Sequence, residues 1–298
     1  MELIFTTTTR LIDASLRCAI KHKNVKILNC SLNTSHRYIR TYYARLYEAK
    51  FLVGILAGIL TQTDKIGYVA DYPIFGNVAN INAFALGVAM VNPRAQVILK
   101  WTTLKNGGSM EQIYEDLTKE GVDYISDQDM ITPKHASRRF GLYQLTDGEP
   151  VNVAMPVINW GVLYETLISY VLDSAWDSAD SDTESKPINY WWGLSSRVVD
   201  IILSNKVTPQ TKRLIDNLKS QIIRNRFIPF SGEIVSQDDV IRNADNEELE
   251  IDDIIRMDWL VKNVTGFIPT KEDLKERAQP IVELKGVKHE ENEDITSG

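Results

Sequence analysis

Short apolar runs alternate with longer stretches of helical periodicity through the first half of the chain, and this alternation limits the fold more than any other feature. The predicted strands are residues 3–5, 25–28, 65–70, 96–101, 122–126 and 141–145. The predicted helices are residues 11–20, 39–60, 80–91 and 110–120. Repeated βα units favour parallel sheets with helices on both faces, in which ligands sit at the carboxyl ends of the strands. The pattern therefore predicts a doubly wound α/β protein.

The later part of the chain is less regular. We expect a strand at 151–158, a helix at 160–172, two short strands within 190–203 and a helix at 208–226. Pro209 suits the first turn of that last helix. The chain turns polar from Ser236 onward, and residues 285–298 are predicted to be a disordered tail.

Gly54 and Gly58 lie four residues apart in the longest predicted helix. Because glycine has no side chain, this spacing lets another backbone approach the helix closely. The pair predicts a tight helix crossing in the core.

Length and charge narrow the classes of protein. The 298 residues are enough for two modest domains, and the net charge of −7 argues against a general nucleic-acid binder. The longest apolar run, residues 51–60, is too short to cross a bilayer, and no secretory signal is visible at the start. As written, the chain is expected to be soluble, and either cytoplasmic or without a leader that it once had.

Signals of catalysis or metal binding are missing from the sequence. Cys18 and Cys30 are interpreted as small buried residues, with a disulfide as the alternative, and the four histidines have no ligand-like spacing. No P-loop, dinucleotide-binding glycine motif or nucleophile elbow is present. We expect no metal, no cofactor and no enzymatic activity.

Aromatic and acidic side chains at strand ends are the candidate ligand contacts. Aromatic rings stack on flat ligands, and carboxylates hydrogen-bond to sugar hydroxyls. Ordinary core packing is the alternative for each aromatic residue, and a solvated loop with a helix cap is the alternative for the carboxylates. The candidates are Tyr72, Phe75, Trp101, Asp127, Asp129 and Trp192.

Four segments in the first half of the chain closely resemble the basic membrane protein family. These segments are GYVADYPI at 67–74, NINAFALG at 80–87, VNPRA at 91–95 and WT at 101–102. Shorter likenesses occur at 41–49, 52–58, 159–161, 192–194, 198–200 and 257–261, so the resemblance covers roughly residues 3 to 266. The family comprises substrate-binding lipoproteins of ABC transporters, including purine-nucleoside receptors.

This resemblance implies a type I periplasmic-binding fold with two lobes joined by three crossovers. It implies a nucleoside-like ligand, an ABC permease partner and a lipid-anchored location at the cell surface or in the periplasm. Residues 1–65 with roughly 159–190 are expected to form lobe 1. Residues 66–158 with roughly 191–235 are expected to form lobe 2, followed by a C-terminal extension at 236–298.

Some positions depart from the family pattern. Family members begin with two βα units before the strand at 3–5, so we expect a fragment, an unusual gene start or an upstream segment that is supplied separately. An exposed sheet edge that allows self-association is expected as well. The turn at the ribose site is altered, and Asp147 is its remaining candidate contact. Arg197 stands where the family has glycine, and the family's nearby binding lysine has no clear match.

The sequence therefore predicts the solute-binding component of an ABC importer, which closes two lobes on a nucleoside or a similar small ligand. A cytoplasmic sensor or regulatory domain that kept the fold is the alternative. A nucleoside hydrolase is a third hypothesis, for which no nucleophile is evident.

Overall fold

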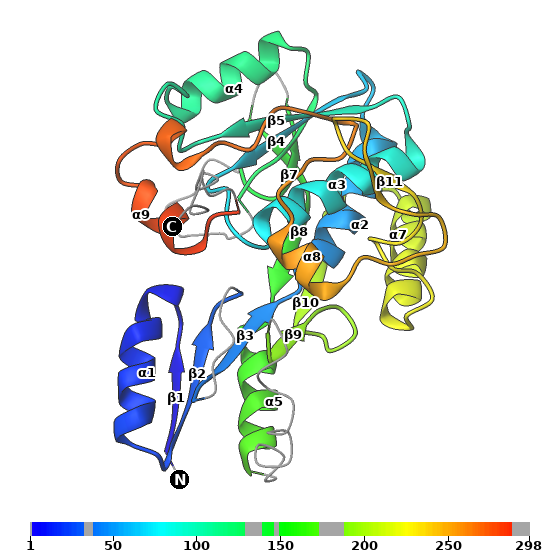
Figure 1. Cartoon of the computed structure of the whole chain (residues 1–298). Coiled ribbons are helices and arrows are strands. Elements are labelled where there is room, and N and C mark those ends of the chain that lie inside the picture. The colour runs from blue at the N-terminus through cyan, green and yellow to red at the C-terminus, as the bar shows by residue number, and fades with distance from the viewer. Residues whose placement is uncertain (1, 33–37, 129–138, 146–148, 173–187, 288–298) are drawn as a thin grey trace.

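The computed structural model describes residues 2–32, 38–128, 139–145, 149–172 and 188–287. Within these ranges the chain forms two large sheets, one in the lower and one in the upper part of Figure 1. The first sheet has the strand order β1-β2-β3-β9, and its pairings are all parallel. Its strands are β1 (Glu2–Thr6), β2 (Val25–Cys30), β3 (Arg40–Ala44) and β9 (Tyr190–Trp192).

Helices cover both faces of the first sheet. The helix α1 (Ile12–Lys21), which follows the short helix η1 (Thr9–Leu11), buries Ile12 and Ala19 against Ile27 and Ile39. The helix α5 (Trp160–Leu172) belongs to a separate cluster with Leu28 and Tyr42 of the sheet. The two clusters lie on opposite faces, as the predicted doubly wound arrangement requires.

The second sheet has the order β10-β8-β7-β6-β4-β5-β13 within the described residues. Its strands are β10 (Val199–Leu203), β8 (Val151–Ile158), β7 (Leu142–Gln144), β6 (Tyr124–Ser126), β4 (Lys65–Ala70), β5 (Gln96–Trp101) and β13 (Val264–Thr265). The pairings β4-β5, β4-β6 and β5-β13 are parallel, whereas β6-β7, β7-β8 and β8-β10 are antiparallel. The sheet is therefore mixed. The connection from β7 to β8 is too short for a crossover helix, so those strands pair antiparallel.

The second sheet also has helices on both faces. The helix α4 (Met110–Lys119) packs Ile113 and Leu117 against Val69, Ile98 and Ile125. The other cluster contains α2 (Tyr47–Leu60), α3 (Asn77–Val91) and α7 (Pro209–Ile223). Smaller elements follow: β11 (Ile234–Val235), β12 (Ile241–Asn243), α8 (Ile251–Arg256), η3 (Lys271–Asp273) and α9 (Gln279–Lys285). No helix in the described ranges is both long and apolar enough to cross a membrane.

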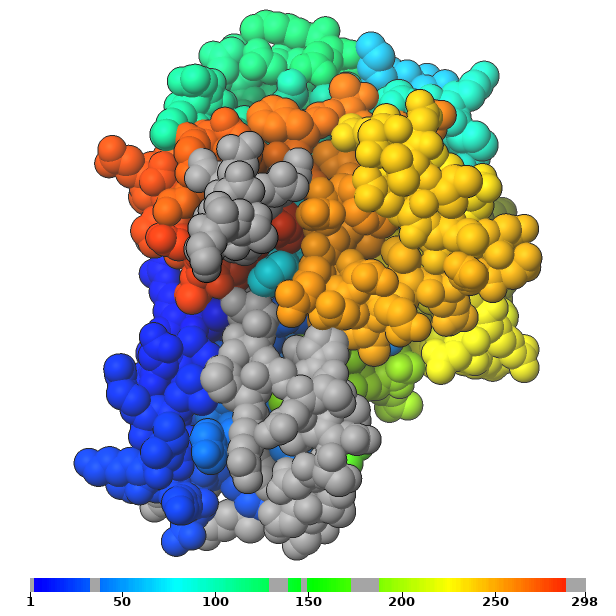
Figure 2. Space-filling model, viewed as in Figure 1, coloured from blue at the N-terminus to red at the C-terminus, as the bar shows by residue number. Residues whose placement is uncertain are grey.

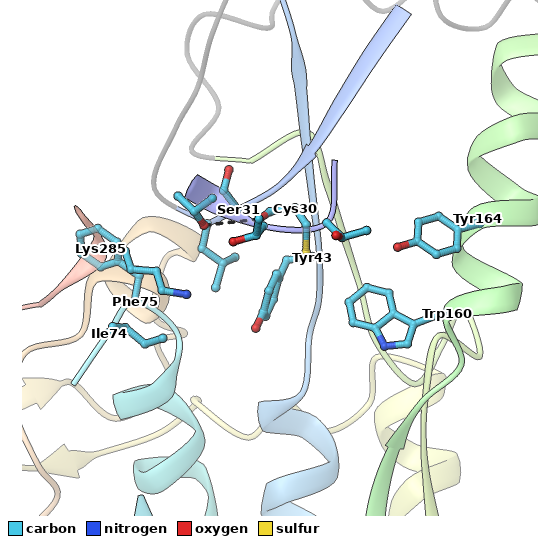
Figure 3. A pocket seen from close by; sticks show the side chains of 12 residues that line it. Cys30, Ser31, Tyr43, Ile74, Phe75, Trp160, Tyr164 and Lys285 are labelled. Atoms are coloured by element: carbon cyan, nitrogen blue, oxygen red, sulfur yellow. Dashed lines mark hydrogen bonds between the residues drawn. The ribbon is translucent and has the colours of Figure 1, made fainter. Parts of the chain in front are cut away.

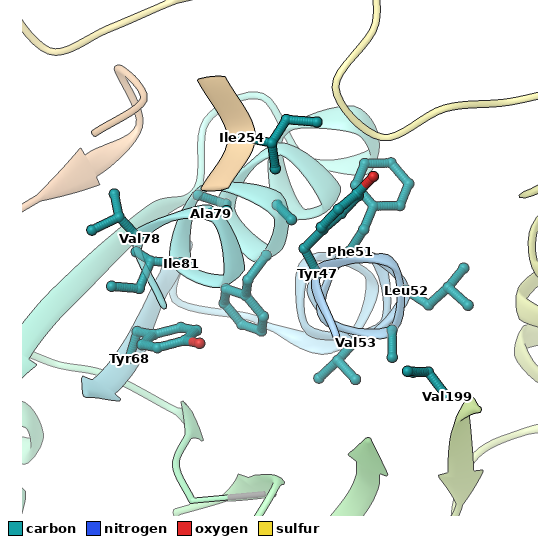
Figure 4. Close-up of a cluster of buried hydrophobic side chains, with 14 of the residues drawn as sticks. Tyr47, Phe51, Leu52, Val53, Tyr68, Val78, Ala79, Ile81, Val199 and Ile254 are labelled. Atoms are coloured by element: carbon teal, nitrogen blue, oxygen red, sulfur yellow. The ribbon is translucent and has the colours of Figure 1, made fainter. Parts of the chain in front are cut away.

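The crossing of α2 and α3 forms the centre of the core, and Figure 4 shows α2 end-on with α3 beside it. A Cβ atom on Gly54 would collide with the carbonyl oxygen of Phe84, and one on Gly87 with that of Phe51. A Cβ on Gly58 would lie 2.9 Å from the carbonyl oxygen of Val88. The tight crossing predicted from Gly54 and Gly58 is confirmed, and Gly87 is its counterpart on α3.

Within the described residues the chain passes between the two sheets three times, after β3, after β8 and after β9. The helix predicted at 39–60 begins only at Tyr47, because residues 40–44 pair as a strand with β2. Tyrosine and threonine favour strands, and this preference outweighed the helical spacing. Because α2 packs on α3, β8 and β10, we propose that the first lobe boundary falls near Ala44 and a later one near Gly193.

Replacing Gly54 by alanine is expected to lower the free energy of unfolding by about 1–3 kcal/mol, because the backbone of α3 cannot move aside. Gly161, in α5, is the matched control, since a Cβ there meets nothing within 4 Å. Gly161→Ala should leave stability unchanged or raise it by up to about 1 kcal/mol through helix propensity. Urea denaturation of both variants measures the difference, and equal effects would contradict the tight crossing.

Candidate functional site

A cavity of about 530 Å³ lies where the two sheets face each other. The residues after β1 and β2, at their carboxyl ends, form one side of it, and the loop after β4 forms the other. Figure 2 shows the N-terminal residues in blue directly below the C-terminal segment in orange and red. The cavity therefore occupies the position where a doubly wound α/β protein binds its ligand.

Hydroxyl groups line the side of the cavity nearest β1. Thr7, Thr8 and Thr9 follow this strand directly. The Nδ2 atom of Asn29 donates to Thr6 Oγ1 at 2.7 Å and to the carbonyl of Thr8 at 3.0 Å, and Thr9 Oγ1 donates to the carbonyl of Cys30 at 3.4 Å. These bonds hold the loop after β1 against β2.

Aromatic rings form a second wall of the cavity. Trp160 stacks on Tyr164 with a centroid distance of 6.0 Å, and the Tyr164 hydroxyl lies 3.2 Å from that of Tyr42. Phe5 meets Tyr164 edge-on at 4.9 Å. Figure 3 shows Trp160 and Tyr164 on α5, with Tyr43 of β3 between them and the opposite wall. The rings pack against one another, so each is held by its neighbours in this wall.

The opposite wall combines the loop after β4 with the C-terminal segment. The amide of Phe75 donates to the carbonyl of Lys285 at 2.9 Å, and the amide of Val287 donates to the carbonyl of Pro73 at 3.2 Å. This pairing places Ile74, Phe75 and Lys285 at the cavity (Figure 3). Residues 285–287 therefore belong to the folded site, although the sequence predicted a disordered tail from residue 285.

The titratable groups of the cavity favour an uncharged or anionic ligand. Burial raises the pKa of the Cys30 thiol to about 11, although the nearby Lys285 opposes the shift. Burial also raises the pKa of Tyr43 to about 12. Both groups therefore stay neutral at physiological pH, while burial lowers the pKa of Lys285. The described lining residues include no carboxylate.

Of the predicted ligand contacts that the structure describes, Phe75 alone lines this cavity. Trp101 is 2% exposed, and its Nε1 donates to the carbonyl of Phe267 at 2.7 Å. It borders a different hollow, of about 480 Å³, beside α4. Tyr72 packs against Leu274 and its neighbours near α9. Trp192 packs on Tyr190 and Tyr170, at centroid distances of 5.4 and 5.8 Å.

Asp127 lies away from the cavity and is 3% exposed. Its Oδ2 accepts hydrogen bonds from the hydroxyls of Tyr114 at 2.7 Å and Tyr143 at 3.3 Å, and its Oδ1 accepts from the amide of Gln128 at 2.7 Å. Burial raises its pKa, and the tyrosine and amide bonds only partly offset this effect. The carboxylate links α4 to β7 and the loop after β6.

The remaining predicted contacts have different outcomes. Asp129 and Asp147 lie outside the described residues. Arg197 is exposed, and its φ of 61° is in the left-handed region, which explains why a glycine suits this position. Sequence analysis missed Ser31, Tyr43 and Lys285 as site residues. Ser31 follows a strand end directly, which is a usable signal, whereas Lys285 reaches the site only through tertiary contacts.

The comparisons with known proteins agree with the predicted family likeness and fold. Residues 1–141 match the family described as "ABC transporter substrate-binding protein PnrA-like". The match covers slightly less than half of the 298 residues, and over this part the chain is similar to that substrate-binding family. The predicted likeness to the basic membrane protein family is thereby confirmed, and such a family binds solutes for transporters and is not a class of enzymes.

Two curated relatives extend over more of the chain. A purine-binding protein of Brucella abortus is 25% identical over 279 residues, which cover 90% of this chain and 77% of the relative. A putative ABC transporter glucose-binding protein of Haloferax volcanii is 25% identical over 242 residues, which cover 78% of this chain and 60% of the relative.

Solved structures confirm the fold. A transcriptional activator of the comK gene from Bacillus halodurans has a TM-score of 0.59 at 13% identity, covering 77% of this chain and 81% of its own. A solute-binding protein from Conexibacter woesei has a TM-score of 0.52 at 13% identity, covering 76% and 79%. At such low identity these likenesses concern the fold alone. They support the predicted type I periplasmic-binding architecture.

The variant Asp127→Asn should change how folding stability depends on pH. A folded carboxyl with a raised pKa keeps its proton at pH values where the unfolded carboxyl has lost it. The stability of the wild type relative to Asp127→Asn should therefore fall as pH rises above 3.8, by about 1.4 kcal/mol per unit of raised pKa. Urea denaturation across this range measures the trend, and parallel pH profiles would contradict it.

Proposed function

We propose that this substrate-binding protein takes a purine nucleoside or a similar flat-ringed solute into the cavity between its two sheets and delivers it to an ABC permease. The cavity itself carries the proposal. Its volume of about 530 Å³ is within the usual range for a small-molecule site. It combines aromatic walls for a planar ring with hydroxyl groups for a sugar.

The stacking surfaces come from both lobes. Trp160 and Tyr43 stand on the side of the first sheet, and Phe75 stands on the side of the second. A ring held between Phe75 and the opposite aromatic wall would contact both lobes at once. Such a ligand binds the closed arrangement more tightly than an open one, and so favours closure about the three crossovers.

The name of the Brucella relative supports a purine ligand, and the absence of a carboxylate among the described lining residues agrees with an uncharged nucleoside. The name of the Haloferax relative makes glucose the main competing ligand hypothesis.

We place the protein outside the cytoplasm with a lipid anchor, as its family implies, and assign it no catalytic activity. Strand β1 is an edge strand of the first sheet, so self-association through this edge belongs to the same proposal.

Calorimetric titration with inosine, guanosine, adenosine and glucose tests the ligand class. We expect binding of at least one purine nucleoside and no comparable binding of glucose. Stacking of a base on an aromatic side chain contributes about 1–3 kcal/mol, so Trp160→Ala and Phe75→Ala should each weaken nucleoside binding by roughly 5- to 150-fold.

Phe267→Ala is the control for these variants, because Phe267 is 54% exposed and lies outside the cavity. Its nucleoside affinity should equal that of the wild type. Binding of glucose but of no nucleoside would overturn the proposed ligand. Equal affinity losses in all three variants would show that the cavity is not the binding site.

A further inference from the structure

Polar groups without partners meet in the cavity. The Oγ atom of Ser31 is fully buried and has no hydrogen-bond partner, although the residue is only 1% exposed. Within the described part of the chain, neither the Tyr43 hydroxyl nor the Lys285 ammonium has a hydrogen bond or ion pair, and both residues line the same cavity. A buried polar group without a partner is destabilising, so the Ser31 hydroxyl is poised for a ligand. The partly buried Tyr43 hydroxyl and Lys285 ammonium can bind the same ligand.

These donor groups favour a ligand that carries hydrogen-bond acceptors. A lysine ammonium can only donate, and the serine and tyrosine hydroxyls can donate as well. The described lining residues include no carboxylate that could accept from an amino group of the ligand. In Figure 3 the Lys285 side chain extends from beside Phe75 toward the part of the cavity where Ser31 and Tyr43 lie.

Backbone pairing fixes Lys285 beside the proposed stacking residue. The Phe75 amide bonds to the carbonyl of Lys285 itself, and the Gly286 amide donates to the carbonyl of Val282 at 2.6 Å, which ends α9. Gly286 also forms a β-bridge with Ile74. A ring that stacks on Phe75 therefore presents its edge to a lysine whose backbone is bonded to the same residue.

The two common types of purine differ at this edge. A 6-oxopurine presents two adjacent acceptors, O6 and N7, and lysine recognises this pair in other complexes. A 6-aminopurine presents one acceptor and one donor there. An ammonium group facing this edge would bind the first type and repel the amino group of the second.

We propose that Lys285, with the Ser31 hydroxyl, forms a subsite that selects 6-oxopurine nucleosides over 6-aminopurine nucleosides. This proposal rests on the proposed function and adds the substrate class to it. It gives the C-terminal segment a direct part in specificity, although this segment lies far from the rest of the site in the sequence.

The test compares inosine and guanosine with adenosine by calorimetry on the wild type, Lys285→Met and Ser31→Ala. The wild type should bind the 6-oxopurine nucleosides at least roughly 10-fold more tightly than adenosine. Because a hydrogen bond to a charged group is lost, Lys285→Met should weaken inosine binding by roughly 10- to 100-fold. Adenosine binding should stay the same or become tighter, since the repulsion of its amino group is also lost. Ser31→Ala should weaken inosine binding by roughly 3- to 10-fold.

The chain provides matched controls. Ser126 also has a buried Oγ without a partner but lies outside the cavity, so Ser126→Ala should leave affinity unchanged. Lys206 is exposed and lies away from the site, and Lys206→Met controls for the lost charge. If Lys285→Met unfolds the protein, Lys285→Gln removes the same charge and keeps a polar side chain of similar length.

The possible failures are distinguishable. If the wild type binds no purine nucleoside, the proposed function falls and the subsite with it. If the wild type binds purine nucleosides but prefers adenosine, or if Lys285→Met weakens inosine and adenosine equally, the subsite alone is wrong.

Discussion

An ion pair between the partly exposed Arg45 and the buried Glu48 joins two of the chain crossings between the two sheets. Glu48 is 5% exposed, accepts from Arg45 at 3.2 Å and accepts from the amide of Leu194 at 2.7 Å. Arg45 in turn donates to the carbonyl of Trp191 at 3.0 Å, and its own amide donates to the carbonyl of Trp192 at 2.7 Å. The crossing after β3 and the crossing after β9 are thus bonded to each other. Burial raises the pKa of the Glu48 carboxyl, and Arg45 and the Leu194 amide oppose this shift and so favour the charged form of Glu48.

This pair couples the core to the cavity. Glu48 lies on α2, which packs closely on α3 through the glycine contacts. A Cβ on Gly193 would displace the Glu48 carboxylate from the amide of Leu194, so glycine at this position preserves that hydrogen bond. The strand before Arg45 carries Tyr43 into the cavity. Packing around the second sheet therefore helps to position a cavity-lining side chain of the first sheet.

Sequence patterns predicted the elements of the second lobe well because its buried strands and apolar helices carry strong periodic signals. They failed at β3, where Thr41, Tyr42 and Tyr43 satisfied a helical spacing as easily as a strand. They could not assign strands to sheets either. The two strands predicted within 190–203 pair in different sheets, and this depends on contacts with β3 and β8 that no local pattern records.

In the candidate ligand site too, some residues follow from local sequence patterns, whereas others reach the cavity only through tertiary contacts. A position after a strand end led to the prediction of both Phe75 and Trp101 as ligand contacts. Phe75 lines the cavity, whereas the side chain of Trp101 packs inward and bonds to the carbonyl of Phe267. The direction of a side chain at a strand end depends on which neighbours cover each face of the sheet. Lys285 reaches the cavity through backbone pairing with a loop more than two hundred residues earlier.

The candidate site is divided between residues on the side of the first sheet and residues on the side of the second, and the proposed function requires these two sides to close on the ligand. Ser31, Tyr43 and Trp160 belong to the side of the first sheet, whereas Phe75 and Lys285 are bonded together on the side of the second. A ligand that contacts only one side gains nothing from closure. One that stacks on Phe75, satisfies Lys285 and reaches the buried Ser31 hydroxyl gains contacts that exist together only in the closed form. Under the proposed function, the same interactions both recognise the ligand and favour the closed form. The closed shape of the protein would then indicate to a permease that a ligand is bound.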